Sequence, residues 1–573
     1  MDRINPILTP TENDEGHAKA VAYSRRKWLS TLLKTGNEKI IDAYEKYDRL
    51  CTENTENSEI MPKSGAIGPI RPLTVNELSK MSNTQIAAYL NAYKETKVIG
   101  LPDLEGQGLA DTLAKCVEAS PQRFSDNLLP FQDVSNLYLS SLLQGFYSAW
   151  RDGKEFDWAA LLQFIYQTFS SEQFWTEQYE TGFNYRNWFF SCAADLISEG
   201  TKSDKHAFDT QFLPHAEKIL LILVEHAQQS VSTLNNLPSD VLNSDRGKVF
   251  SAMINYALRF ARTNEDKHEE SRWPQSIKAD FTKRLDRNVE PSLEFSYTLG
   301  FYLPYLSYLD KEWVVGNIDR IFPLHDEDHW QAAFSGYLIH SRVHEEFYSL
   351  LKAQGHYQKA LNTHFADAEV LDKLVKHICT GWIEDCESLN DKSSLIYQLI
   401  HNDNPNLLSG LVYFFFRRKD SLSEKVKAKV MPAWRVLFEV LSQRTEEKEC
   451  QAVLSPLSMW LGLIDEIDDE VLAWIKVSMN YLDKVPGYAF TLSRVIEALQ
   501  RHVLTTPEKV GKIYLEIPTR EMWLLGHTQK NEVEETVRIL YKKGYKNIAN
   551  EICNRFGKAG VDFLRSVYEE SKR

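Results

Sequence analysis

Cysteine is scarce in this chain of 573 residues, and its spacing is irregular. The cysteines are odd in number, and no two of them form a CxxC pair. The seven are Cys51, Cys116, Cys192, Cys379, Cys386, Cys450 and Cys553. Disulfide frameworks and zinc knuckles use closely spaced pairs, so this pattern is typical of reduced thiols in a cytosolic protein. We therefore expect a cytoplasmic protein.

Long hydrophobic runs are also missing. The longest uninterrupted apolar stretches lie at 219–224 and 411–416, far short of the roughly 20 residues that cross a bilayer. The first residues, MDRINPILTPTENDEG, are polar and acidic and lack the apolar core of a secretory signal. The sequence thus predicts neither a membrane span nor an export signal.

Nucleotide-binding and nucleophile motifs are absent as well. The dipeptides Gly153-Lys154 and Gly247-Lys248 lack the upstream glycine and the Ser or Thr of the phosphate loop GxxxxGK[ST]. No Gly-rich dinucleotide turn and no GxSxG elbow occurs. We expect no catalytic residue, no cofactor and no enzymatic activity in this chain.

Positive charge is in deficit. With 80 acidic and 66 basic side chains the net charge is −14, which repels phosphate and argues against broad nucleic-acid binding. One local basic group follows aromatic residues at 414–419: Arg417, Arg418 and Lys419 are candidates for contacting nucleic acid. The alternative is the buried body of a helix whose basic end reaches solvent.

What the sequence does contain is one amphipathic helix pattern after another. Thr74 with Glu77, and Ser82 with Gln85, fit the capping box at a helix start. A helical hairpin is expected at 137–169, broken at Asp152-Gly153. No pattern demands a sheet, and no fixed repeat of 34 or about 40 residues aligns. We predict an all-α fold, an irregular α-solenoid built as a HEAT- or TPR-like array of helical hairpins.

The chain divides by composition into five parts. We expect an N-terminal helical segment at 1–50, with helices at 18–34 and 38–50, and an irregular linker at 51–73. Three helical arrays should follow, at 74–290, 291–446 and 447–573. The polar stretches 228–247 and 263–274 are predicted as long surface loops.

Histidines offer the best candidates for a metal site. His325 and His329 stand four residues apart in HDEDH, and His340 and His344 do so in HSRVH. That spacing places two imidazoles on one helical face, as zinc sites require. A metal-dependent hydrolase at 325–346 is therefore one alternative function. Neither pair is HExxH, and exposed acids and histidines near helix starts explain the same residues without a metal.

Several segments resemble the C-terminal helical region of large bacterial antiphage-defence proteins of the STAND or NACHT NTPase type or of the sirtuin-linked type. They are GPIRPLTVNELSKMS (68–82), GLADTLAKCVEASPQRFSDNL (108–128), LLQGFYSAWRDGKEFDW (142–158), WQAAFSGYLIHSRVHEEFYSLLKAQGHYQKAL (330–361), PEKVGKIYLEI (507–517) and GYKNIANEICNRFGKAGVDFLRSVYE (544–569). The shared positions are hydrophobic spacings and caps, and no catalytic residue carries over.

The resemblance implies a sensor that engages a phage protein and controls an NTPase or effector module. This chain lacks those modules, so it is either a fragment of a larger protein or a separate subunit. From the residues and the resemblance together we expect a non-enzymatic helical scaffold for protein recognition. A metal-dependent hydrolase and a nucleic-acid-binding subunit stay as alternatives.

Overall fold

The computed structural model describes residues 29, 38–52, 71–93, 104–176, 185–228, 233–264, 272–340, 342–421, 423–484, 487–518 and 525–572. In these ranges every regular element is an α-helix or a short 3₁₀-helix, and there is no strand. The all-α prediction is therefore confirmed. The chain forms two compact units, Met1–Pro72 and Leu73–Arg573.

In the first unit the described helix is α2 (Glu38–Thr52), which confirms the helix predicted at 38–50. The helix predicted at 18–34 and the linker predicted at 51–73 lie almost entirely outside the described residues.

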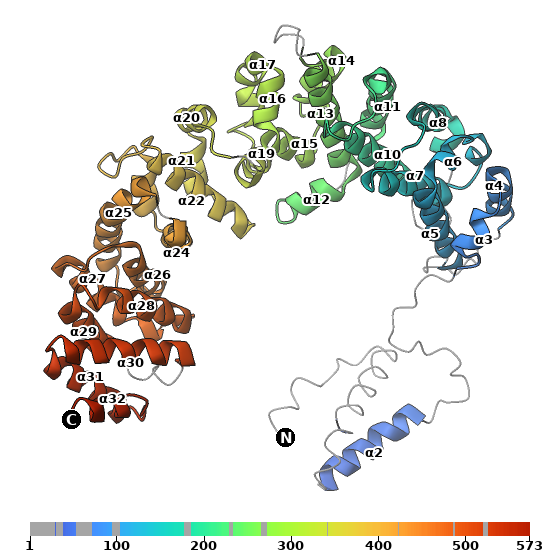
Figure 1. Ribbon diagram of the computed structural model, residues 1–573. Helices are drawn as coiled ribbons and strands as arrows, with labels where there is room; N and C mark the ends of the chain where they lie inside the picture. Colours follow the sequence, from blue (N-terminus) through green and yellow to red (C-terminus); the bar gives the residue numbers. More distant parts are fainter. Residues whose placement is uncertain are drawn as a thin grey trace. The chain divides into compact units, whose positions relative to one another are not determined.

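The second unit is a two-layer array of helices (Figure 1). In the first layer each helix packs against the next one along the chain. These helices are α5 (Leu104–Ala119), α7 (Asn136–Arg151), α10 (Tyr185–Thr201), α13 (Asp245–Thr263), α15 (Leu293–Phe301), α19 (Glu327–His340), α22 (Ala368–Ile383), α24 (Pro405–Phe416), α26 (Lys448–Leu457), α28 (Tyr488–His502) and α30 (His527–Lys542).

Most of the other helices connect successive members of the first layer, whereas α3 and α4 precede α5 and α31 and α32 follow α30. Several pack on one another, α8 on α11, α27 on α29 and α29 on α31. The other helices are α3 (Val75–Ser79), α4 (Asn83–Ala92), α6 (Pro121–Ser125), α8 (Trp158–Ser170), α9 (Glu172–Thr176), α11 (Leu213–His226), α12 (Leu237–Asn243), α14 (Gln275–Arg284), α16 (Leu303–Leu309), α17 (Lys311–Gly316), α18 (Ile318–Ile321), α20 (Glu345–Ala353), α21 (His356–Leu361), α23 (Leu395–Ile400), α25 (Glu424–Ser442), α27 (Asp469–Met479), α29 (Pro507–Glu516), α31 (Lys546–Lys558) and α32 (Arg565–Glu570). Contacts between elements close in chain order are typical of α-solenoids.

Local signals explain where many of these helices begin. Both predicted capping boxes form, at Thr74 before α3 and at Ser82 before α4. The predicted hairpin is α7 and α8, joined through Gly153 at φ +77°. Asp157 caps α8, its carboxylate accepting a hydrogen bond from the Ala160 amide at 3.0 Å.

One hydrophobic core cluster extends through the array, with buried members from Leu78 to Val567. The boundaries predicted inside the array, at 290 and 446, stay predictions. Helices on either side of both positions pack together, α13 on α15 and α25 on α26.

One predicted loop is wrong. The stretch 228–247 contains α12 and the start of α13. Helix α12 packs on α13 and α15, and its Leu237 and Val241 are buried in a small cluster with Tyr297 and Ala332. Two apolar side chains on a short polar segment give too weak a periodicity to reveal the helix, which tertiary packing stabilises. The other predicted loop, 263–274, lies largely outside the described residues.

Candidate groove across the first layer

A polar groove of about 650 Å³ crosses four successive helices of the first layer, α5, α7, α10 and α13. Because these helices lie side by side, residues more than a hundred positions apart line one recess. The lining side chains are Asp111, Ser140, Ser141, Gln144, Asn187, Trp188, Ser191, Cys192, Gln228, Asn243, Ser244, Asp245 and Lys248.

Amide side chains line part of this groove. The Nδ2 of Asn187 donates to the Oε1 of Gln228 at 3.2 Å. The thiol of Cys192 lies 3.7 Å from the Oε1 of Gln144, which accepts its weak hydrogen bond. Gln144 is exposed, so its amide nitrogen is available as a donor. Such amides offer both donors and acceptors to a bound backbone.

The groove also holds an exposed indole. Trp188 is 47% exposed, although tryptophan in a soluble protein is mostly buried. An edge-to-face contact with buried Tyr185, with ring centroids 5.1 Å apart, helps to fix its ring. Exposed, fixed aromatic rings are typical of the residues that dominate binding interfaces.

A smaller cavity of about 260 Å³ adjoins the groove. It shares Asn187, Gln228 and Asp245 with the groove. In its lining His226 stacks on Trp175, with ring centroids 4.0 Å apart and planes 21° from parallel. The two recesses thus meet at Asp245, and the smaller one is also lined by the Arg186 side chain.

Neither the Cys192 thiol nor the Ser191 hydroxyl in the groove is arranged as a nucleophile. Burial raises the pKa of the Cys192 thiol to about 12, so this side chain stays protonated near neutral pH. The Ser191 hydroxyl donates to the Asp245 carboxylate, and no histidine among the described residues is hydrogen-bonded to Ser191. A serine nucleophile needs such a base.

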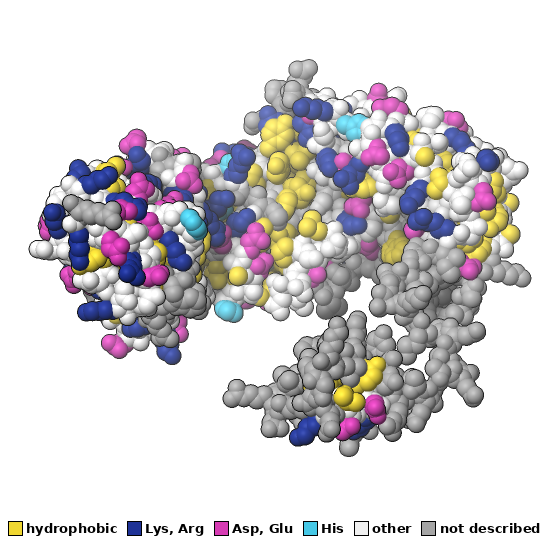
Figure 2. Space-filling view, turned by 60° about the horizontal axis from the view of Figure 1, so that its bottom comes forward, with side chains coloured by type: hydrophobic (Ala, Val, Ile, Leu, Met, Phe, Trp, Pro, Cys, Tyr) yellow, Lys and Arg dark blue, Asp and Glu magenta, His cyan; other side chains and the backbone are white. Residues whose placement is uncertain are grey.

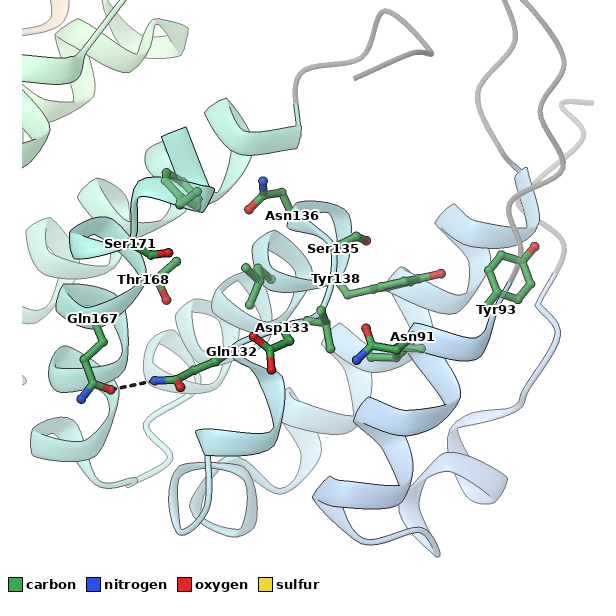
Figure 3. Close-up of a pocket in the computed structure, with 14 residues that line it drawn as sticks. Asn91, Tyr93, Gln132, Asp133, Ser135, Asn136, Tyr138, Gln167, Thr168 and Ser171 are labelled. Carbon is green, nitrogen blue, oxygen red and sulfur yellow. Dashed lines mark hydrogen bonds between the residues drawn. The ribbon is translucent and has the colours of Figure 1, made fainter. Parts of the chain in front are cut away.

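A second polar cavity, of about 530 Å³, lies where the ends of α4, α7 and α8 meet (Figure 3). Gln132 and Gln167 close one side of it, with Nε2 and Oε1 2.9 Å apart. Its lining holds one charged group, Asp133, which is exposed. The groove combines carboxylates, amides and an exposed indole, so we take it, and not this cavity, as the candidate site.

The candidate metal ligands do not form the predicted arrangement. His325 is exposed in the turn before α19, whereas His329 is buried inside that helix with its Nδ1 2.8 Å from the Ser296 hydroxyl. His340 is the last residue of α19, and His344 caps α20 beyond a non-helical segment. The expectation of one helical face is therefore wrong for both pairs, because a helix boundary falls inside each motif.

No three His, Cys, Asp or Glu side chains come together as metal ligands within the described ranges. Burial, followed by the nearby Arg287 guanidinium, lowers the pKa of His329. This imidazole is a neutral buried group held by Ser296.

The candidate basic residues contact the protein itself. Arg418 lies over the Phe414 ring, its guanidinium carbon 3.6 Å from the ring centroid, and donates to the Phe414 carbonyl at 2.8 Å. Lys419 pairs with Glu497 at 2.9 Å and exposed Arg417 lies 3.5 Å from Asp372. On the face seen in Figure 2, basic and acidic side chains are interspersed and hydrophobic ones form a stripe over the middle of the array. The contacts of Arg418 and Lys419 match the alternative interpretation, a helix whose basic end reaches solvent.

Comparison with known proteins adds little. No protein-family model matches the chain, and no curated protein matches it. One solved structure similar to the chain is described as a circular tandem repeat protein with novel repeat topology and enhanced subunit contact surfaces. The match covers 97% of this chain and 98% of that one, at 11% sequence identity and a TM-score of 0.18. A TM-score this low does not show a shared fold.

No helix in the described part of the chain is long and apolar enough to span a membrane.

Proposed function

We propose that this chain is a non-enzymatic helical scaffold that binds an extended segment of another protein in the groove across α5, α7, α10 and α13. One observation carries the proposal. The groove sets amides, carboxylates and the exposed Trp188 on four packed helices, and a peptide backbone needs such donors and acceptors when it is taken out of water.

The helices that present these side chains favour this use. Each first-layer helix packs on the next, so the groove exists before a partner arrives. A preorganised site loses less conformational entropy on binding than a loop that must fold around its ligand. Extended faces of this kind are the surfaces that helical-repeat proteins use for recognition.

A narrower proposal rests on the sequence resemblance alone. In it the chain is the sensor part of a bacterial antiphage defence system, its partner is a phage protein, and it controls an NTPase or effector module. Six described cysteines are free thiols, which favours a reducing compartment such as the cytoplasm.

Affinity capture with matched variants tests the proposed function. The groove variant is Gln144→Ala with Trp188→Ala; the control is Tyr166→Ala on α8, an aromatic 38% exposed and outside the groove lining. We expect a protein that is retained by the wild type and the control and lost from the groove variant. Equal retention by all three would place recognition elsewhere on the chain.

A further inference from the structure

The charged side chains of the groove do not balance. Its lining contains two acidic groups, Asp111 and Asp245, and one basic group, Lys248. Lys248 forms an ion pair with Asp195 at 2.8 Å, and Asp195 lies outside the lining. Lys248 is thus shared between Asp195 and Asp245, and with Asp195 counted three carboxylates stand against one ammonium.

The two carboxylates have few partners. Asp111 is exposed and has no hydrogen-bond or ion-pair partner among the described residues. Asp245 accepts a hydrogen bond from the Ser191 hydroxyl, and the Lys248 ammonium, which also pairs with Asp195, stabilises its negative charge. Exposed Asp111 keeps its water, but Asp245 is partly buried, and a carboxylate removed from water is unstable unless a cation or several donors offset the desolvation.

The pKa of Asp245 reflects how few groups stabilise its negative charge. Burial raises the pKa of Asp245, and neither the Ser191 hydroxyl nor the Lys248 ammonium fully offsets that effect. The nearby Asp195 carboxylate raises the pKa further. A cation bound beside Asp245 would act in the opposite direction and stabilise the ionised carboxylate.

Trp188 also favours a bound cation. Its exposed indole lines the same recess as Asp111 and Asp245. The face of an indole attracts ammonium and guanidinium groups, with a strength that grows as water is excluded. Carboxylates and an aromatic face together favour a cation on an apolar stem.

From this combination we infer that the groove binds an extended peptide segment through a lysine or arginine side chain placed between Trp188 and the carboxylates of Asp111 and Asp245. The amides of Gln144, Asn187 and Gln228 then take the peptide backbone. This inference rests on the proposed function and names the chemistry of the partner. An acidic segment would be repelled, and a purely apolar one would bury Asp245 without a cation.

Fluorescent peptide pools of one length test the inference directly. Each pool has the form X₃-Z-X₃, with X drawn from Gly, Ala and Ser, and with Z as Lys or Arg in one pool, norleucine in the second and Glu in the third. Binding is followed by anisotropy at low ionic strength on the full chain. We expect the cationic pool to bind at least about tenfold more tightly than the norleucine pool, the scale of one desolvated charge pair with a cation–π contact. The Glu pool should bind more weakly than both.

Two variants locate the effect. Asp111→Asn with Asp245→Asn should reduce cationic binding to the level of the norleucine pool. The control, Asp133→Asn with Glu172→Gln, removes the same charge from exposed residues outside the groove and should leave the preference unchanged. Because Asp245 begins α13 and its replacement could weaken that helix, Trp188→Ala, at an exposed position, serves as a second variant and should lower cationic binding.

The outcomes separate the two ideas. If the three pools bind equally well and Trp188→Ala weakens all of them, the groove takes peptides without charge selection, and this inference is overturned while the proposed function stands. If no pool binds, both are overturned. If the cationic preference survives in the Asp111 and Asp245 variant, the selecting charge lies elsewhere, and the inference is wrong.

Discussion

Gly300 on α15 and Gly336 on α19 bring two helices of the first layer into backbone contact. A Cβ added at Gly300 would overlap the Ala333 carbonyl oxygen, and one added at Gly336 would overlap the Tyr297 carbonyl oxygen. Neither obstacle is a flexible side chain that can move away. The crossing of α15 and α19 therefore requires glycine at both positions.

Gly300→Ala should destabilise the array by about 1–3 kcal/mol, because the methyl group has to push two helices apart. The midpoint of urea unfolding measures this. Gly557→Ala is the control: Gly557 lies inside α31 and nothing approaches its Cβ position within 4 Å. Since alanine favours helix over glycine, the control should be neutral or more stable by up to about 1 kcal/mol. Equal effects of both variants would contradict the close crossing.

Glu290 is the centre of a buried ion network. It is fully buried, its Oε1 accepts from the Nε of Arg246 at 2.8 Å, and its Oε2 accepts from the Nη1 of Arg284 at 3.1 Å. Burial by itself would raise the pKa of Glu290, but hydrogen bonds from Arg246 and Ser292 and the two guanidinium charges lower it below its ordinary value.

Glu290→Gln should therefore destabilise the fold by about 3–5 kcal/mol, because it leaves the buried Arg246 guanidinium without its carboxylate, whereas Arg284 keeps Asp280. Glu470→Gln breaks a pair of similar geometry on the surface, Arg435 with Glu470 at 2.6 Å. Exposed pairs contribute only about 0–1 kcal/mol. Thermal or urea unfolding of the two variants should show this contrast, and a surface-sized effect at Glu290 would argue against the buried network.

The buried side chain of His356 should make the protein less stable in acid. It is fully buried, accepts a hydrogen bond from the Trp330 indole nitrogen at 3.1 Å, and its pKa is lowered to about 4, mainly by burial. The unfolded chain, with a histidine pKa near 6.5, binds more protons than the folded one between these values. The free energy of unfolding should therefore fall as the pH drops from about 6.5 to 4, by at most about 3 kcal/mol from this residue.

Urea unfolding at several pH values checks this sign. His356→Leu should show a shallower fall between pH 6.5 and 4 than the wild type, whatever its stability at neutral pH. His325→Gln, at an exposed position, should keep the wild-type slope. An unchanged slope in His356→Leu would mean that this imidazole is protonated in the fold.

Metal analysis addresses the hydrolase alternative. Because His329 is hydrogen-bonded to Ser296, and because His340 ends α19 whereas His344 lies just before α20, we expect the purified protein to contain no stoichiometric zinc. A chelator should leave the unfolding midpoint unchanged, both in the wild type and in the double variant His340→Ala with His344→Ala. Zinc at one atom per chain, lost in that double variant, would support the metal site instead.

The sequence predicts those parts of the fold that depend on neighbours along the chain. The capping boxes at Thr74 and Ser82 follow from local geometry. The helix boundary between His340 and His344 was missed because the helical period continues through a segment that the structure breaks. Helix α12 was missed because its partners, Tyr297 and Ala332, are distant in sequence.

None of the groove residues is predicted as a site from the sequence, for a related reason. Asp111, Gln144, Trp188 and Asp245 each look like an ordinary exposed position on its own amphipathic helix. Only the packing of α5, α7, α10 and α13 brings them together. The one local hint is an unusual tryptophan on a polar face, and a single residue of that kind does not define a ligand.

Site-specific photocrosslinking tests the central claim most directly. A photoreactive phenylalanine analogue replaces Trp188 in the groove or, as control, Tyr166 on α8, and the protein is irradiated in its own cells. The account predicts a crosslinked protein partner at position 188 that is absent at 166, attached through a segment that contains lysine or arginine. Crosslinks to one partner at 166 and none at 188 would contradict the claim that the groove recognises a protein.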